Sequence, residues 1–436
     1  MATQTTVQVR HELLHRLDHA RQLTDALFAV VRPEALYDRP IPERHRIVFY
    51  IGHLEAFDRN LLGPPLNLET SDSSLDKLFA FGIDPVGGGL PTDQPSDWPS
   101  LEEVKKYSRD TREKLDARLD HALVSDSRPD GQLLHVAVEH RLMHAETLAY
   151  MFHHLPFERK IPQPASPELK AHPVASGMIG IPAGVATLGL TRGSSEFGWD
   201  NEFEAHEVSV PSFSIDIYKV TNGEFLDFVR DGGYQERSLW TTDAWDWINS
   251  QGIRHPYFWM RRNDSWSYRT MFGERPLPME WPVYVSHAEA AAYARWAGKT
   301  LPSEAQFHRA AFGTPEQIER DYPWGNTPPG GRYGNFDFHR WDPAPVNAFP
   351  ASRSAFGVED LIGNGWEWTS SLFEPFPGFE PFPFYPGYSA NFFDGKHYVM
   401  KGGSSRTAAC LLRRSFRNWF QPHYPYVYAG FRCVTN

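Results

Sequence analysis

The apolar residues of this chain follow two different patterns, and the change between them falls near residue 160. Up to about residue 155 they recur every three or four positions, which places them on one face of an α-helix. Several such stretches with one long connection predict an antiparallel helical bundle. These stretches lie at about 11–31, 43–62, 101–123 and 131–154.

After residue 176 the helical spacing gives way to short β-like runs with frequent glycine and proline. The segment between, 160–176, is polar and rich in proline, which is typical of a linker. One clear helix is expected near 286–298. We therefore expect a helical bundle over 1–159, a linker over 160–176 and a loop-rich α+β domain over 177–436.

The composition limits which classes of molecule the protein is expected to bind. Lys and Arg number 43 and Asp and Glu 54, so the net charge is −11, which argues against a broad nucleic-acid-binding surface. No apolar run reaches the ~20 residues of a membrane span, and the first residues lack the apolar core of a signal peptide. Two cysteines, Cys410 and Cys433, suit a reducing compartment. We expect a cytoplasmic protein that binds small molecules, with neither nucleic acid nor membrane as partner.

Helical phase selects among the 19 histidines. His140 and His144 lie one turn apart on the apolar stripe of the helix near 131–154, so both are expected to face the bundle core. His53 lies on a comparable stripe of the helix that ends near residue 62. Two facing helices would then bring three imidazoles to one place, which is how helical bundles build metal sites.

Histidine spacing alone does not define a site. His11, His15 and His19 have the same spacing but lie behind the apolar stripe of their helix, so we expect them to face solvent. For His140 and His144, a pair of buried, hydrogen-bonded histidines without metal is the alternative. Three neutral imidazoles suit zinc, copper or iron, and the spacing does not choose between these metals.

Carboxylates beside the histidines could fix the tautomer of each imidazole. Glu55, Glu139 and Glu146 are the candidates nearest in sequence. Because acidic residues on helices usually face water, we expect these three side chains to be exposed.

Longer motifs occur in a fixed order along most of the chain. They are FYIGHLEAFD (49–58), EHRLMHAETLAYM (139–151), MIGIPAG (178–184), DIYKVTNGEFLDFV (216–229), WAGKTLPSEAQFHRAA (296–311), GNGWEWTSS (363–371), KGGSSRT (401–407), RRSFRNWF (413–420) and AGFR (429–432). In these motifs the chain resembles the sulfoxide synthases of ergothioneine biosynthesis. The resemblance implies a four-helix DinB-like bundle followed by a domain of the formylglycine-generating-enzyme, C-type-lectin-like fold.

The resemblance also implies an activity. Members of this family are non-haem iron(II) oxidoreductases that use dioxygen to join a sulfur donor to the imidazole of hercynine, N-α-trimethylhistidine. The sulfur is oxidised to a sulfoxide as the carbon–sulfur bond forms. The family's iron ligands correspond to His53, His140 and His144, the same three residues that helical phase selects.

Further roles follow from the resemblance. The family's proton-donating tyrosine lies in a Tyr-x-x-Tyr-Ser stretch, which residues 385–389 match, so Tyr385 is assigned that role; a purely structural loop aromatic is the alternative. Asn418 and Trp419 match the pair that binds the trimethylammonium group, and an aromatic face favours such a cation by ~0.5–2 kcal/mol. Met143 stands where some members have a Gln that contacts the imidazole.

The donor site departs from one branch of the family. Members that use γ-glutamylcysteine have an Asp after the Asn-Trp pair, an Arg four residues later and arginines in the bundle loop. Here Phe420 and Tyr424 occupy those positions, and no Arg lies between Asn60 and Ser108. Because Arg pairs with carboxylates, we expect cysteine or a neutral thiol instead. An aromatic pocket of Phe420, Tyr424 and Tyr426 also suits the selenoneine synthases, which couple a selenosugar to hercynine.

Three other functions remain open on the sequence. An ovothiol-type synthase would act on unmethylated histidine. A formylglycine-generating oxidase would bind copper through Cys410 and Cys433, although buried structural cysteines are the better interpretation. A non-catalytic binding protein on the same scaffold would take up no iron.

Overall fold

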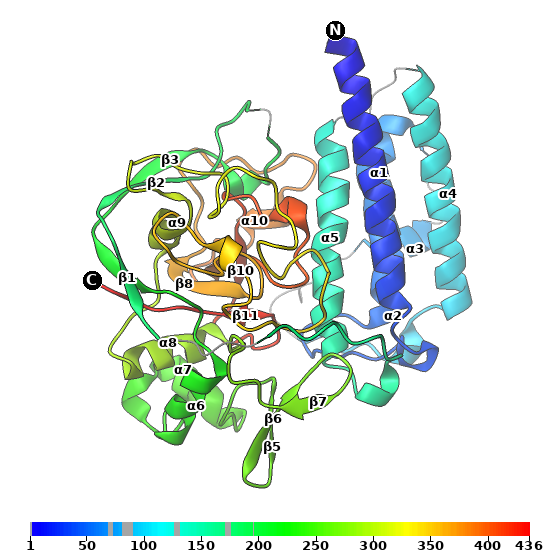
Figure 1. Ribbon diagram of the computed structural model, residues 1–436. Helices are drawn as coiled ribbons and strands as arrows, with labels where there is room; N and C mark the ends of the chain where they lie inside the picture. The colour runs from blue at the N-terminus through cyan, green and yellow to red at the C-terminus, as the bar shows by residue number, and fades with distance from the viewer. Residues whose placement is uncertain (1, 69–72, 81–89, 126–130, 171–175, 195) are drawn as a thin grey trace. The chain divides into compact units, whose positions relative to one another are not determined.

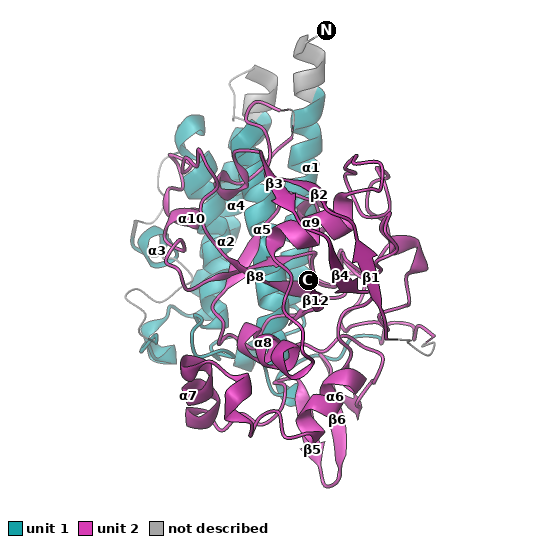
Figure 2. Cartoon of the chain, turned by 90° about the vertical axis from the view of Figure 1, so that its left-hand side faces the viewer, with its two compact units in different colours: residues 1–164 teal, residues 165–436 magenta. Residues whose placement is uncertain are grey.

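The computed structural model describes residues 2–68, 73–80, 90–125, 131–170, 176–194 and 196–436. The chain divides into two compact units, residues 1–164 and residues 165–436 (Figure 2). Residues 171–175 of the expected linker lie outside the described residues.

Within the described residues, the first unit is built on four long helices (Figure 1). They are α1 (Ala2–Phe28), α2 (Ile47–Leu62), α4 (Leu101–Ser125) and α5 (Gly131–His153). The predicted helical bundle is therefore confirmed, with α5 packed on α1 and α2, and α2 packed on α4. A short helix that the sequence analysis did not predict, α3 (Ser73–Leu78), lies in the long connection between α2 and α4. None of the described helices is both long and apolar enough to cross a membrane.

Helix α5 is more deeply buried than its apolar stripe predicts. Every residue from 136 to 142 is buried, including Glu139 and Arg141. A helix that is buried around its circumference must pair its charged side chains within the protein. The bundle meets this requirement with an ion network.

The network joins all four long helices. Arg141 of α5 lies 2.6 Å from Asp58 and 3.1 Å from Glu55, both on α2. Glu55 also accepts a 2.6 Å bond from Arg112 of α4, and Arg21 of α1 lies 3.7 Å from Asp58. Burial opposes the ionisation of Glu55, but Arg141 and Arg112 outweigh burial and lower its pKa to about 2.

The second unit has the loop-rich α+β character that the sequence predicts. Its described strands are β1 (Met178–Ile181), β2 (Gly184–Leu188), β3 (His206–Val210), β4 (Phe213–Asp216), β5 (Trp259–Arg262), β6 (Ser265–Arg269), β7 (Glu274–Pro276), β8 (Trp366–Leu372), β9 (Tyr398–Lys401), β10 (Asn418–Phe420), β11 (Ala429–Gly430) and β12 (Val434–Thr435). Its described α-helices are α6 (Asn222–Arg230), α7 (Thr242–Ser250), α8 (His287–Trp296), α9 (Glu304–Phe312) and α10 (Gly387–Ala390).

The described strands form small sheets in the orders β1-β4-β12, β10-β9-β8-β11, β2-β3 and β5-β6-β7. Strand β12 pairs antiparallel with β4, which ties the end of the chain to the start of the unit. Helix α9 packs on β2, and its Phe307 and Phe312 enter a core with Phe213 and Ile215 of β4.

Three helices of this unit begin at capping boxes that are visible in the sequence. Thr221 and Glu224 cap α6, and the corresponding pairs are Ser286 with Glu289 for α8 and Ser303 with Gln306 for α9. The unit also contains a buried ion pair. Arg432 lies 2.6 Å from Glu367 of β8, and both side chains are fully buried. Local caps and buried ion pairs thus order a unit with few long elements.

We predict that Asp58→Ala destabilises the bundle by about 3–5 kcal/mol, because it leaves the buried Arg141 without one of its carboxylates. The loss should appear as a lower free energy of unfolding of the helical unit, measured by urea denaturation with far-ultraviolet circular dichroism.

Asp116→Ala is the matched control, because Asp116 belongs to the same network but its side chain is 46% exposed. Its loss should be below about 1 kcal/mol. Equal losses in the two variants would contradict the assigned role of the buried pair.

Candidate metal centre

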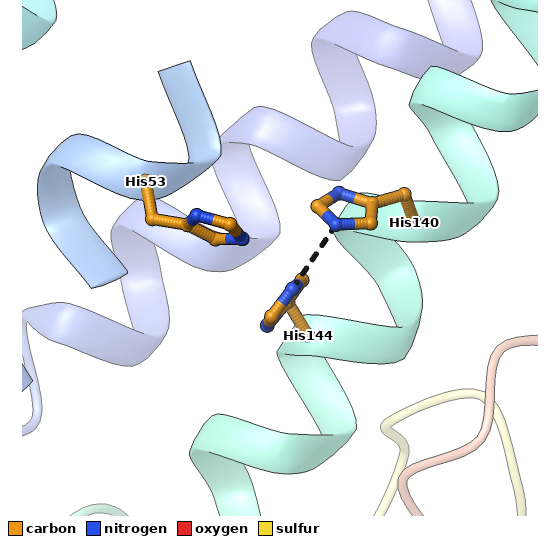
Figure 3. A group of neighbouring side chains, drawn as sticks. All are labelled: His53, His140 and His144. Carbon is orange, nitrogen blue, oxygen red and sulfur yellow. Dashed lines mark hydrogen bonds between the residues drawn. The ribbon is translucent and has the colours of Figure 1, made fainter. Parts of the chain in front are cut away.

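Three histidines meet inside the bundle (Figure 3). His53 comes from α2, and His140 and His144 come from adjacent turns of α5. One ring nitrogen of each lies within 4.8 Å of the others, and the Nε2 atoms of His140 and His144 are 3.2 Å apart. The three side chains are buried, with exposed fractions of 6, 4 and 5%. The structure thus brings together the residues that helical phase selected.

The histidines of α1 behave differently. His11, His15 and His19 are exposed, as their phase predicts. The same spacing therefore gives a buried cluster on one helix and a solvent-facing row on another, depending on where the apolar stripe lies.

A backbone carbonyl fixes the tautomer of His53. Its Nδ1 lies 2.8 Å from the carbonyl oxygen of Phe79, and because a carbonyl can only accept, Nδ1 carries the proton. The lone pair is then on Nε2, which is buried and makes no hydrogen bond to any described residue. Phe79 can approach because residue 52 is a glycine; a Cβ there would lie 2.5 Å from the Phe79 ring.

Burial keeps these imidazoles neutral. It is the largest cause that lowers the pKa of His53 to about 4, and it also takes the pKa values of His140 and His144 well below the usual range. The neighbouring imidazoles and Arg141 lower the values further, because each disfavours another positive charge. Neutral imidazole is the form that binds metal ions.

The donor atoms fit a metal ion. A histidine nitrogen lies ~2.0–2.1 Å from a bound transition metal, so two such ligands at roughly a right angle are about 3 Å apart. The 3.2 Å separation of the His140 and His144 nitrogens matches this value. The buried Nε2 of His53, which makes no hydrogen bond to a described residue, could supply a third donor.

Aromatic rings hold the imidazoles in place. Phe57 stacks on His140 with ring centroids 3.4 Å apart, and Phe49 stacks on His53 at 4.8 Å. Both phenylalanines lie on α2, one turn to either side of His53. The rings limit rotation of the ligands and give the centre apolar walls.

The expectation that the neighbouring acids are exposed is wrong. Glu55, Glu139 and Glu146 are only 2, 2 and 8% exposed. Burial of Glu55 is possible because Arg141 and Arg112 neutralise it, a pairing between helices that the sequence of α2 alone does not reveal. The group that orients His53 is a backbone carbonyl.

Met143 lies on α5 beside His144 and is half-buried. Its backbone carbonyl accepts a 3.1 Å bond from the Thr147 hydroxyl, one turn further along the helix. The side chain of Met143 is apolar, whereas some members of the resembling family have a Gln at this position.

The other residues singled out from the sequence lie in the second unit, in two aromatic groups. In the first, Trp419 stacks on Phe373 at 4.0 Å and contacts Tyr388 edge-on at 5.6 Å, and Tyr388 lies 5.4 Å from Tyr385. Asn418 precedes Trp419 on β10 and accepts a 2.9 Å bond from the Trp419 amide.

In the second aromatic group, Phe420 stacks on Tyr424 with centroids 4.9 Å apart. Tyr426 meets Tyr424 edge-on at 5.0 Å, and Tyr257 meets Tyr426 in the same way. Tyr257 is a member that sequence analysis missed, because it lies far from the motif in the chain.

Comparison with known proteins gives matches to both units. Residues 164–436 match the sulfatase-modifying factor enzyme 1-like domain, and residues 16–148 match the DinB superfamily. The hercynine oxygenase of Mycobacterium tuberculosis is 41% identical over 57% of this chain and 58% of its own length. Ergothioneine biosynthesis protein 1 of Neurospora crassa is 28% identical over 92% of this chain and 55% of its own length.

A third relative carries a different name. The formylglycine-generating enzyme of Bos taurus is 28% identical over 59% of this chain and 74% of its own length. This chain spans a little over half the length of the hercynine oxygenase and of the fungal protein.

We predict that the metal-free bundle loses stability as the pH falls from about 6.5 to about 4. An unfolded imidazole has a pKa near 6.5, whereas folded His53 has a pKa of about 4, so in this window the unfolded state binds a proton that the folded state does not. The stabilisation is complete above pH 6.5 and is lost through the window, by about 3 kcal/mol for this residue.

Urea unfolding at a series of pH values with a chelator present measures this slope. His53→Gln should reduce the slope, because it removes one of the three buried imidazoles, whereas His15→Gln, which removes an exposed imidazole, should leave it unchanged. Identical pH profiles for His53→Gln and the unaltered protein would show that burial of His53 does not control the slope.

Proposed function

Because the chain belongs to the sulfatase-modifying factor enzyme 1-like family and carries a DinB bundle before that domain, we propose that it is a non-haem iron(II) enzyme. The proposed reaction couples a thiol to the imidazole carbon of hercynine, with dioxygen as the oxidant and a sulfoxide as the product. The three-histidine centre carries this proposal. The relatives named hercynine oxygenase and ergothioneine biosynthesis protein support it.

The reaction balances with these reactants alone. A C–H bond of hercynine and the S–H bond of the donor break, and a C–S bond forms. One atom of dioxygen joins the sulfur, and the other leaves as water with the two hydrogens. His53, His140 and His144 would hold the iron(II), which would supply dioxygen activation.

The protein's contribution at the metal is a fixed, neutral donor set. The Phe79 carbonyl keeps the proton of His53 on Nδ1, so that Nε2 can bind. Phe57 and Phe49 hold the rings of His140 and His53 and exclude water from them. Because the imidazoles are already neutral at neutral pH, they need not release protons when iron binds.

Trp419 is proposed to bind the trimethylammonium group of hercynine. A bulky cation without hydrogen-bond donors is favoured by an aromatic face. The indole is held in position by Phe373, Tyr388 and Phe392. The side-chain oxygen of Asn418 accepts from the Trp419 amide, which leaves its amide group to donate to the substrate.

The proposed donor is cysteine or another thiol without an additional carboxylate. The stacked rings of Phe420 and Tyr424 occupy the positions where an acid and an arginine would hold γ-glutamylcysteine. The same aromatic surface supports a second candidate, a selenoneine synthase that joins a selenosugar to hercynine, because flat rings accommodate a sugar without charge pairing.

Cys433 is fully buried, and burial raises the pKa of its thiol well above the usual range. This environment is typical of a structural cysteine, which favours the structural interpretation over a copper ligand. A non-catalytic binding role does not account for three neutral imidazoles that are buried at one point.

Anaerobic loading with iron(II), followed by air and hercynine, tests the function and its donor. We expect turnover with cysteine or a neutral thiol to exceed turnover with γ-glutamylcysteine, since no guanidinium stands at the family's carboxylate-binding positions. A selenosugar in the same panel decides the second candidate, and unmethylated histidine in place of hercynine tests the ovothiol-type alternative. His144→Ala should lose both iron and turnover, measured by metal analysis and mass spectrometry.

His15→Ala is the matched control, because it removes an exposed histidine of α1. It should retain about one iron per chain and full activity. A His144→Ala protein that keeps its iron and its turnover would refute the ligand assignment.

Tyr385 is proposed to donate a proton that directs dioxygen chemistry toward coupling. Tyr385→Phe keeps the ring beside Tyr388 and removes only the hydroxyl. We expect the ratio of coupled sulfoxide to sulfinic acid to fall at least about tenfold, since proton transfer by a positioned side chain contributes ~100-fold or more. Mass spectrometry of the products measures the ratio.

Tyr388→Phe serves as the control for this substitution, because it removes a hydroxyl from the same loop. It should leave the product ratio near that of the unaltered protein. An unchanged ratio in Tyr385→Phe, or the same shift in both variants, would contradict the role of Tyr385.

A further inference from the structure

The loop that carries Tyr385, residues 382–389, includes the first residues of α10, and both its ends lie against one buried segment, η6 (Asp200–Glu202). At its far end, the Ser389 hydroxyl donates to the Asp200 carboxylate, and the Asn201 side-chain amide donates to the Ser389 oxygen at 3.0 Å. At its near end, the backbone amide of Phe382 faces the same Asp200 carboxylate. Asp200 therefore bonds the far end of the loop and lies beside its near end.

The residue before this segment reinforces the attachment. Trp199 is fully buried and stacks on Tyr388 with ring centroids 4.0 Å apart. The same indole packs against Phe382 at 6.3 Å. Trp199 and Asp200 thus contact the loop on both sides of Tyr385, one through packing and the other through hydrogen bonds.

Between its fixed ends the loop makes two successive turns. The amide of Tyr385 donates to the Phe382 carbonyl at 3.0 Å, and the amide of Tyr388 donates to the Tyr385 carbonyl at 3.2 Å. Two prolines, Pro383 and Pro386, restrict the backbone further. Tyr385 lies where these two turns meet, and its side chain is half-buried.

The anchoring segment is itself fixed. Glu202 accepts a 2.8 Å bond from the Trp199 amide and pairs with Arg413, and the Ser415 hydroxyl donates to it at 2.6 Å. Arg413 and Ser415 lie just before β10, the strand that carries Trp419. The attachment of the Tyr385 loop is thus continuous with the support of β10.

A carboxylate at this position is costly without its hydrogen bonds. Asp200 is fully buried, and burial raises its pKa, while the Ser389 hydroxyl and backbone amides oppose that shift by bonding the charged form. Removing one donor from such a group leaves part of the desolvation cost uncompensated. The buried Asp200 carboxylate therefore depends on the Ser389 hydroxyl for part of its compensation.

We propose that Asp200 and Asn201 are positioning residues that fix Tyr385 through Ser389, and so set how much donor is coupled to hercynine and how much becomes sulfinic acid. The inference rests on the proposed function, in which Tyr385 donates the directing proton. In the competing reaction both atoms of dioxygen bind the sulfur of the thiol. The hydrogen of the thiol becomes the acidic hydrogen of the sulfinic acid. Proton transfer depends on hydrogen-bond distance, so a small displacement of Tyr385 favours that reaction.

Ser389→Ala tests the proposal, because it removes the anchoring hydroxyl and leaves Tyr385 unaltered. We expect the ratio of coupled product to sulfinic acid to fall about tenfold or more, with iron content unchanged. Amide hydrogen exchange across residues 382–389, measured on the protein without substrate, should become about tenfold faster. Asp200→Asn keeps the side-chain shape but weakens the acceptor, so it should change both quantities in the same direction and by less.

Ser352→Ala is the matched control. The Ser352 hydroxyl is equally buried and accepts a 3.0 Å bond from the Asp360 amide, outside the loop. It should change neither the product ratio nor exchange in residues 382–389. A comparable shift in Ser352→Ala would show that the effect is general destabilisation and would overturn the inference.

The two proposals fail in different ways. If the unaltered, iron-loaded protein forms no coupled product with any donor, the proposed function is wrong. If it does form coupled product while Ser389→Ala and Asp200→Asn both retain its ratio and its exchange rates, the positioning role is wrong and the function stands.

Discussion

Desolvation of three imidazoles at one point of a helical bundle is the constraint on which the rest of the site depends. Burial removes the water that would stabilise imidazolium, so the pKa of His53 falls to about 4, and those of His140 and His144 fall well below their usual range. The protein compensates by hydrogen-bonding His53 to the Phe79 carbonyl and by stacking the rings on phenylalanines. The result is a neutral set of nitrogen donors in an apolar setting.

The same two helices that carry the histidines also carry the ion network. On α2, His53 faces the cluster while Glu55 and Asp58 face the arginines, and on α5 His140 is followed directly by Arg141. On each of the two helices, the charged side chains therefore pair on a different side from the imidazoles. Because the network reaches α1 and α4 as well, the positions of the ligands depend on the packing of the whole bundle.

The second unit is ordered by buried hydrogen bonds to carboxylates more than by long elements. Glu202 fixes a short helical turn to the chain before β10, and Asp200 in the same turn holds the Tyr385 loop. Arg417 pairs with Glu304 at 3.2 Å, and its guanidinium lies over the ring of Phe376. Loops held in this way can present aromatic side chains at defined positions.

The sequence by itself determined the bundle, the loop-rich second unit and the inward direction of His53, His140 and His144, because helical phase is a local property that a run of residues reveals. Only the tertiary structure decided what surrounds them. The partner of His53 is a backbone carbonyl 26 residues away, and the contact between Asp200 and Ser389 joins residues 189 apart. Such contacts depend on how distant segments pack, and no local pattern encodes them.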